Sequence, residues 1–275
     1  MKFLLRLKEE RAVVFSALIS LLALIVMILG GVVAGLLIPV VGDDYYTALL
    51  IQEGVTLVFL FWLLWATKLG FVLTRRGAGL LHAVQVAAYP LSLIALVAMT
   101  MGMLGAESGA ALQSPMQIAI YFLSMLSIGL VEEITFRGIV AEALIHRYGT
   151  SRAGVWKATA VGGLIFGLAH MSNVFAANPF GVLIQVAVAG VLGMLFAAIY
   201  YRTGNLWICV LLHAGLDAAS LLESGLYGAG TISDMVSSFS LMNLTPCLTY
   251  GLPILFLLRR KKLKEVQLWF GQAKD

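Results

Sequence analysis

The sequence predicts an all-α fold, a polytopic bundle of about eight transmembrane helices around a polar cavity within the membrane. Of the 275 residues, 61% are hydrophobic and only 12% are charged, whereas a soluble domain has about 25% charged residues. The mean hydropathy is +0.97. The apolar residues form runs of the length that crosses a bilayer, about 20 residues, and a few glutamates and histidines stand inside those runs.

Eight apolar runs are candidate transmembrane helices. They cover residues 12–40, 46–67, 80–104, 115–146, 154–172, 180–201, 205–223 and 235–258. The first run is too long for a signal-peptide core and no convincing cleavage site follows it, so we expect a retained first helix. Gly30–Gly31, and Gly162–Gly163 with Gly167, give small-residue faces on which helices pack closely. With only six prolines and no low-complexity linker, the chain is expected to form a single membrane domain over residues 1–275.

The basic residues predict the orientation of the bundle. With eight spans, all of the 18 lysines and arginines except Arg137 fall on one side of the membrane. The opposite loops carry acidic residues and no basic ones. Because loops rich in lysine and arginine face the cytoplasm, we expect both termini there, in the cell membrane if the organism is prokaryotic. Basic residues that flank apolar runs also argue against nucleic acid as a partner.

The fourth run contains the exception, Arg137, together with Glu132 and Glu133. A charged side chain at the centre of a bilayer costs at least about 2.5 kcal/mol, so such a cluster indicates a functional site. Glu133 and Arg137 stand four residues apart, share a helix face and are expected to form an ion pair. Glu132 points about 100° away from Glu133 and is left free to act as a general base. The alternative is a structural network of all three residues.

Other runs add further polar side chains. His170 ends the fifth run, and His213 and Asp217 share one face of the seventh. Asp217 is therefore expected to orient His213, with an interhelical hydrogen bond as the alternative. Glu132, His170 and His213 are ligand types of a hydrolytic zinc site, and equally those of a metal-free site in which a glutamate deprotonates a water. Glu53, beside Gln52 in the second run, is interpreted as an interhelical hydrogen-bonding group, with a residue that lines the cavity as the alternative.

Three short motifs lie in these runs. Glu132–Arg137 has the form EExxxR, Phe166–His170 has the form FxxxH, and His213–Asp217 has the form HxxxD. In their order, their spacing and their location on expected membrane helices, they resemble the CPBP family. That family comprises type II CAAX prenyl proteases, bacteriocin-processing proteins and self-immunity proteins, often labelled Abi. The resemblance places a catalytic core at residues 115–223 and extends to the topology of the whole chain.

The resemblance implies an intramembrane endopeptidase. It assigns catalysis to Glu132, His170, His213 and Asp217, and support of the site to Glu133, Arg137 and Phe166. Glu132 would activate the water with help from His170, while His213 and Asp217 would stabilise the oxyanion or bind a ligand. Asp217 departs from the prenyl proteases, which have asparagine in its place. The difference matters because a carboxylate cannot donate a hydrogen bond to an oxyanion.

The resemblance leaves the cofactor and the substrate open. Zinc held by Glu132, His170 and His213 is one possibility, and metal-independent hydrolysis is the other. The implied substrate is a peptide or protein, either a prenylated CAAX C-terminus or a bacteriocin-like peptide. Membrane lipids are the other expected partners. A non-catalytic immunity or partner protein with the same fold is the main alternative. A transporter or proton relay is disfavoured, because the sequence shows no inverted repeat with broken helices in matching halves.

Overall fold

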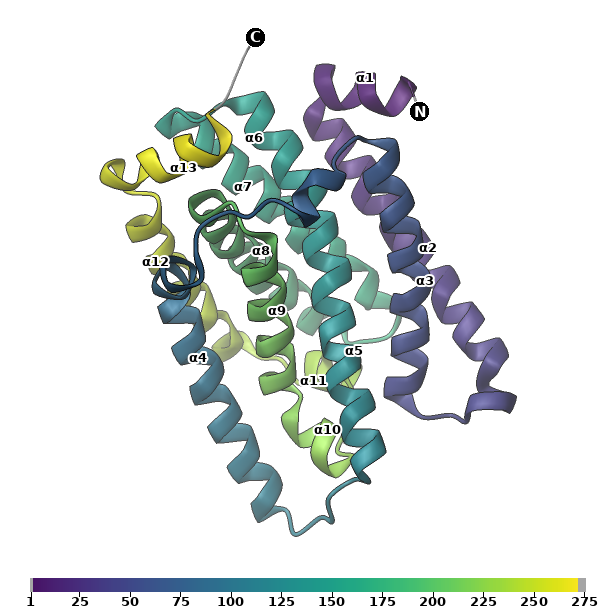
Figure 1. The fold of residues 1–275 in the computed structure, drawn as a ribbon. Coiled ribbons are helices and arrows are strands. Elements are labelled where there is room, and N and C mark those ends of the chain that lie inside the picture. The colour runs from purple at the N-terminus through teal and green to yellow at the C-terminus, as the bar shows by residue number, and fades with distance from the viewer. Residues whose placement is uncertain (1, 272–275) are drawn as a thin grey trace.

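The computed structural model describes residues 2–271, and every regular element in that range is a helix (Figure 1). The all-α fold class is therefore confirmed. The longer elements are α2 (Ala12–Val41), α3 (Tyr45–Ala66), α4 (Leu80–Glu107), α5 (Pro115–Glu133), α7 (Arg152–Ala169), α8 (Pro179–Thr203), α9 (Leu206–Ser220) and α12 (Thr245–Leu257). The shorter ones are α1 (Lys2–Glu10), η1 (Gly70–Leu73), η2 (Ile134–Ala141), α6 (Glu142–Tyr148), η3 (His170–Phe175), α10 (Leu222–Tyr227), α11 (Ile232–Ser237), η4 (Leu241–Leu244), η5 (Arg260–Lys262) and α13 (Leu263–Phe270).

The expected number of eight spans is not confirmed. Among residues 2–271, six helices are long and apolar enough to cross a membrane, or up to seven if a bent pair counts as one span. The seventh expected run folds as α9, which has only 15 residues and is followed by a separate short helix, α10. The eighth divides into η4 and α12, and the chain then bends by 63° towards α13. Hydropathy alone does not show where a helix breaks, so these two runs do not appear as single long helices.

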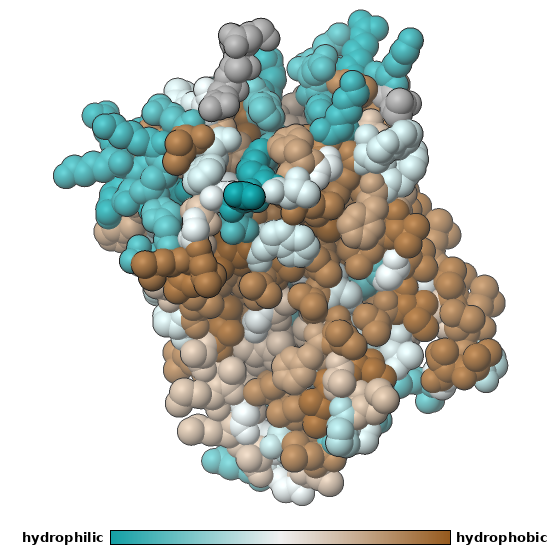
Figure 2. All heavy atoms as spheres, viewed as in Figure 1, coloured by the Kyte–Doolittle hydropathy of each residue, from teal (hydrophilic) through white to brown (hydrophobic). Residues whose placement is uncertain are grey.

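The outside of the bundle is apolar over most of its height. Figure 2 shows hydrophobic residues covering the sides and hydrophilic residues gathered mainly at one end. Large apolar side chains such as Leu36, Trp65 and Leu80 are well exposed, as expected for helices that face hydrocarbon on one side and protein on the other. The described parts of α1 and α13 lie at the hydrophilic end (Figure 1), where Lys8 Nζ donates to Thr67 O at 2.8 Å.

The junction between α8 and α9 is held by the C-terminal helix α13. Gly204 ends α8 with a φ of 59°, in the left-handed region that favours glycine. A Cβ at this position would lie 2.8 Å from the ring of Trp269. The indole of Trp269 donates to Arg202 O at 3.1 Å, and the Arg202 guanidinium pairs with Glu265 at 2.6 Å. These contacts fix the start of α9, the helix that carries His213.

Small residues let the inner helices pack closely, as the sequence predicts for two of the glycine faces. A Cβ added at Gly167 of α7 would lie 2.5 Å from Val186 O of α8, and one at Gly30 of α2 would lie 2.6 Å from Gln52 O of α3. A third contact was not predicted: a Cβ at Gly129 of α5 would lie 2.9 Å from Val210 O of α9. Because α5 and α9 approach so closely, the residues of the first and third motifs face one another.

Candidate active site

The first motif spans a change of helix type. α5 ends at Glu133, and the next eight residues, Ile134–Ala141, wind as a π-helix in which every residue is buried. π-helical turns are rare and occur frequently at functional sites. The wider turn places Thr135 Oγ1 against Val131 O at 2.7 Å and places the Arg137 side chain within the bundle. No feature of hydropathy or spacing indicated this π-helix.

The expected ion pair between Glu133 and Arg137 is present. Arg137 Nη1 lies 2.7 Å from Glu133 Oε1, and both side chains are buried. Arg137 Nη2 donates to Gly193 O of α8 at 3.1 Å, and the guanidinium lies over the rings of Phe166 and Phe196, 4.7 and 5.3 Å from their centroids. Since a buried ion pair needs further partners to offset desolvation, these contacts explain how Arg137 is accommodated among apolar helices.

Glu133 has a second partner, His213 of α9. His213 Nδ1 lies 2.6 Å from Glu133 Oε1, although the two residues are 80 positions apart. A carboxylate at one ring nitrogen of a histidine fixes the orientation of the ring and the role of the other nitrogen. The spacing in the sequence predicted only the ion pair of Glu133 with Arg137. The structure shows that Glu133 joins the cation of η2 to the imidazole of α9.

The other nitrogen of His213 faces two carboxyl groups. Nε2 lies 3.6 Å from Glu132 Oε2 and 3.6 Å from Asp217 Oδ2. The side chains of Glu132 and Asp217 are 27% and 29% exposed, so they form the open side of the cluster. Glu132 Oε2 itself is buried and has no hydrogen-bond partner among the described residues. We call Glu132, Glu133, Arg137, His213 and Asp217 the polar cluster.

His170 stands beside the polar cluster rather than inside it. It begins η3, directly after α7, and its Nδ1 lies 2.9 Å from Phe166 O, one turn earlier. Phe166 is the link between them, because its ring contacts those of His170 and His213, with centroids 5.1 and 5.9 Å apart. Within residues 2–271, His170 makes no hydrogen bond or ion pair with Glu132, His213 or Asp217.

Zinc held by Glu132, His170 and His213 was one of two possibilities, and the described residues do not gather these side chains into such a site. No group of three or more histidine, cysteine, aspartate or glutamate side chains in residues 2–271 is placed to hold a metal ion. His213 Nδ1 is engaged by Glu133, and His170 lies against the backbone of its own helix. The donor set Glu132, His170 and His213 is thus not brought together as ligands within residues 2–271.

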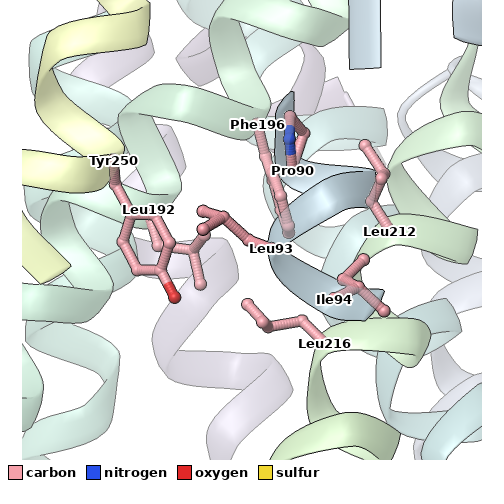
Figure 3. Close-up of a pocket in the computed structure, with 8 residues that line it drawn as sticks. All are labelled: Pro90, Leu93, Ile94, Leu192, Phe196, Leu212, Leu216 and Tyr250. Carbon is pink, nitrogen blue, oxygen red and sulfur yellow. The ribbon is translucent and has the colours of Figure 1, made fainter. Parts of the chain in front are cut away.

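A small apolar pocket borders the polar cluster. It is lined by Pro90, Leu93, Ile94, Leu192, Phe196, Leu212, Leu216 and Tyr250 (Figure 3). Phe196 also packs on the ring of His213, with centroids 5.6 Å apart. Pro90 is shared with a larger groove of about 510 Å³ between α4 and α12, which apolar side chains line for the most part. The polar residues of the cluster pack against one another, and these two neighbouring spaces are lined mainly by apolar side chains.

Glu53 of α3 is a further acidic residue near the cluster. Its side chain is 3% exposed, and Gln52 Nε2 donates to its Oε1 at 3.1 Å. Its Oε2 is buried and has no hydrogen-bond partner among the described residues. The sequence suggested either a group that holds helices together or one that lines the cavity, because the spacing of the second and fourth runs does not show how their carboxyl groups lie relative to each other.

One family model is similar to the segment that carries the site. Residues 114–219 match the family model described as Rce1-like, type II CAAX prenyl endopeptidase Rce1-like. The match begins at Ser114, the N-cap of α5, ends within α9, and includes all three motifs. No curated protein and no solved structure matches the chain.

Proposed function

We propose that this chain hydrolyses a peptide bond within the membrane with a water activated by Glu132, because residues 114–219 match the family model described as type II CAAX prenyl endopeptidase Rce1-like. The observation that carries the proposal is the position of the Glu132 carboxyl group. Its Oε2 lies 3.6 Å from His213 Nε2, and the side chain is 27% exposed on the open side of the cluster, which leaves its other oxygen for a water. A carboxylate so placed can hold a water and take its proton.

The proposed reaction follows general acid–base catalysis. Glu132 accepts a proton from the water as the water oxygen attacks the carbonyl carbon of the scissile bond. The carbonyl oxygen becomes an oxyanion in the tetrahedral intermediate. When the C–N bond breaks, the proton held by Glu132 passes to the leaving nitrogen, which releases an amine and a carboxylate. His170 assists at the edge of the site, in the position that Phe166 gives it.

His213 is the proposed oxyanion donor. With protons on both ring nitrogens, it donates from Nδ1 to Glu133 and from Nε2 to the oxyanion, as a preorganised donor in a site with little water. Asp217, 3.6 Å from Nε2, stabilises this form of the imidazole by its negative charge. The proposal thus gives Asp217 a role that a carboxylate can perform, in place of direct donation to the oxyanion.

The proposed substrate is a prenylated CAAX C-terminus. The matching family is described as one of CAAX prenyl endopeptidases, which points to this class, and the apolar groove between α4 and α12 provides a lipid-like surface beside the site. The basic residues around the hydrophilic end of the bundle support a cytoplasmic location of that end, and with it of both termini. An attached prenyl chain and a cytoplasmic carboxyl terminus would then approach from the same side.

Glu132→Gln tests the proposal. The amide keeps the shape of the side chain and removes the base, so we expect cleavage of a farnesylated CAAX peptide to fall by about 10²- to 10⁴-fold. Glu107→Gln is the matched control, because Glu107 is exposed at the end of α4, and it should cleave normally. An unmodified peptide and a zinc chelator complete the assay. Normal cleavage by Glu132→Gln would contradict the proposal and favour a non-catalytic immunity or partner protein.

A further inference from the structure

α3 and α5 lie side by side and run in the same direction, towards the hydrophilic end (Figure 1). Near their starts, Ser124 Oγ donates to Tyr46 O at 2.8 Å, and the rings of Tyr46 and Tyr121 are 5.0 Å apart. From this contact, Glu53 lies two turns along α3, about 10.5 Å, and Glu132 lies about 12 Å along α5. The register of the two helices therefore brings both carboxyl groups to the same level of the bundle.

Each of these two carboxyl groups has an unused oxygen. Glu53 Oε2 and Glu132 Oε2 are both buried and without a hydrogen-bond partner in residues 2–271. Two ionised carboxyl groups at the same level of the bundle would repel each other. A buried polar atom without a partner costs about 1–3 kcal/mol, and two neighbouring carboxylates cost more. One proton shared between the two groups removes the repulsion and supplies a donor to one of the two oxygens.

Glu53 is also held firmly by its surroundings. Gln52 donates to its Oε1, and α2 makes room for Gln52 with its paired glycines. A Cβ at Gly31 would lie 2.9 Å from Gln52 Oε1, and one at Gly30 would lie 2.6 Å from the backbone oxygen of Gln52. α2 contributes no charged residue to this region. The only described hydrogen-bond donor to the Glu53 carboxyl group is therefore Gln52, on the side away from Oε2.

We propose that Glu53 is a positioning residue of the site, which carries a proton and donates it from Oε2 in a hydrogen bond to Glu132 Oε2, directly or through one water. This bond would orient the Glu132 carboxylate so that its other oxygen holds the attacking water. The inference rests on the function proposed above. A role in packing alone would be served as well by an apolar residue, which avoids the cost of an acid in hydrocarbon.

Two substitutions separate positioning from packing. Glu53→Gln keeps the length of the side chain and a hydrogen-bond donor, so its kcat should stay close to the wild-type value. Glu53→Leu removes the donor, and kcat should fall by about 10- to 100-fold, as expected for a misplaced catalytic group, with KM unchanged. Thr56→Val is the matched control, since Thr56 is buried on the same helix and donates to Gln52 O; it should be as active as the wild type.

Infrared spectroscopy gives a readout that needs neither substrate nor the Leu variant. The wild type should show the C=O band of a buried protonated carboxyl group, Glu53→Gln should lack it, and Glu132→Gln should shift it. Wild-type cleavage by Glu53→Leu, loss of cleavage by Glu53→Gln, or the absence of the band would each overturn the inference. Failure of the proposed function has a different signature, namely that Glu132→Gln cleaves as well as the wild type.

Discussion

At the scale of single residues, the polar cluster is organised by Glu133. One oxygen of this carboxyl group contacts both the Arg137 guanidinium and the His213 imidazole. The contact with Arg137 follows from a spacing of four along one helix and was predicted. The contact with His213 joins two different runs. It was not predicted, because helical periodicity relates residues only within a helix. The same limit applies to Glu53, whose approach to Glu132 depends on how α3 and α5 pack.

Arg137→Met should destabilise the fold more than the paired change Glu133→Gln/Arg137→Met. The single change leaves Glu133 as an uncompensated buried charge, which typically costs about 3–5 kcal/mol. The double change removes both charges, so part of that loss should be recovered. Unfolding of the detergent-solubilised protein by heat measures the difference. A double variant that melts below the single variant would show that the pair itself stabilises the bundle.

Asp217→Asn should keep much of the cleavage activity, whereas Asp217→Leu should lose about 10²- to 10³-fold, the usual effect of an impaired oxyanion site. The amide of asparagine can donate a hydrogen bond to the oxyanion directly, so it replaces the proposed action of Asp217 through His213. Initial rates with the farnesylated peptide measure both effects. Equal activity in the Leu variant and the wild type would remove Asp217 from the mechanism.

At the scale of elements, the sequence located the long helices well and their irregularities poorly. The first six expected runs coincide with helices or helix series of the structure to within a few residues, because hydropathy records which segments prefer lipid. The π-helix at Ile134–Ala141 and the breaks after α9 and α12 depend on backbone hydrogen bonding and on tertiary contacts. These irregular segments set the direction of Arg137 and the ends of α9, so the site was less predictable than the fold.

Gly129→Ala should weaken both folding and cleavage. The added methyl group would lie 2.9 Å from Val210 O and 3.0 Å from Ala214 N, so α9 must shift away from α5 and move His213 with it. Overpacking of this kind costs about 1–3 kcal/mol. Gly54→Ala is the control, because a Cβ there meets no atom within 4 Å, and it should be neutral or slightly stabilising. Equal melting temperatures for the two variants would refute the close approach of α5 and α9.

The contact between α8 and α13 should make stability depend on pH on the acid side. Burial opposes ionisation of Glu265, but hydrogen bonds and positive charge from Lys262 and Arg202 outweigh it and hold its pKa below the ordinary 4.5. A carboxyl group with a lowered pKa stabilises the fold above its ordinary pKa and loses that contribution as the pH falls through the folded value. The loss therefore lies below pH 4.5.

Glu265→Gln should accordingly show a smaller fall in melting temperature on acidification than the wild type. Glu10→Gln serves as the comparison, because Glu10 pairs with Arg6 at the exposed surface, where such pairs contribute little. Its acid dependence should match that of the wild type. If Glu265→Gln also follows the wild-type curve, the link between α8 and α13 does not contribute to stability.

At the scale of the whole molecule, the structure separates a charged end from an apolar body. The described parts of α1 and α13 share the hydrophilic end (Figures 1 and 2), which agrees with the distribution of lysine and arginine along the sequence. We expect tags fused to either terminus to be accessible from the cytoplasm only, as tested by protease protection in sealed membrane vesicles. Protection of one tag and cleavage of the other would require an odd number of crossings.

The apolar groove between α4 and α12 has a kinetic consequence. A molecule that enters it comes from the plane of the membrane and not from bulk water, since the outer face of both helices is largely apolar. The effective concentration of such a substrate is its mole fraction among the lipids. Adding inert lipid at a fixed amount of enzyme and substrate per millilitre should therefore slow turnover by surface dilution, and a rate law written in molar units will not describe this protein.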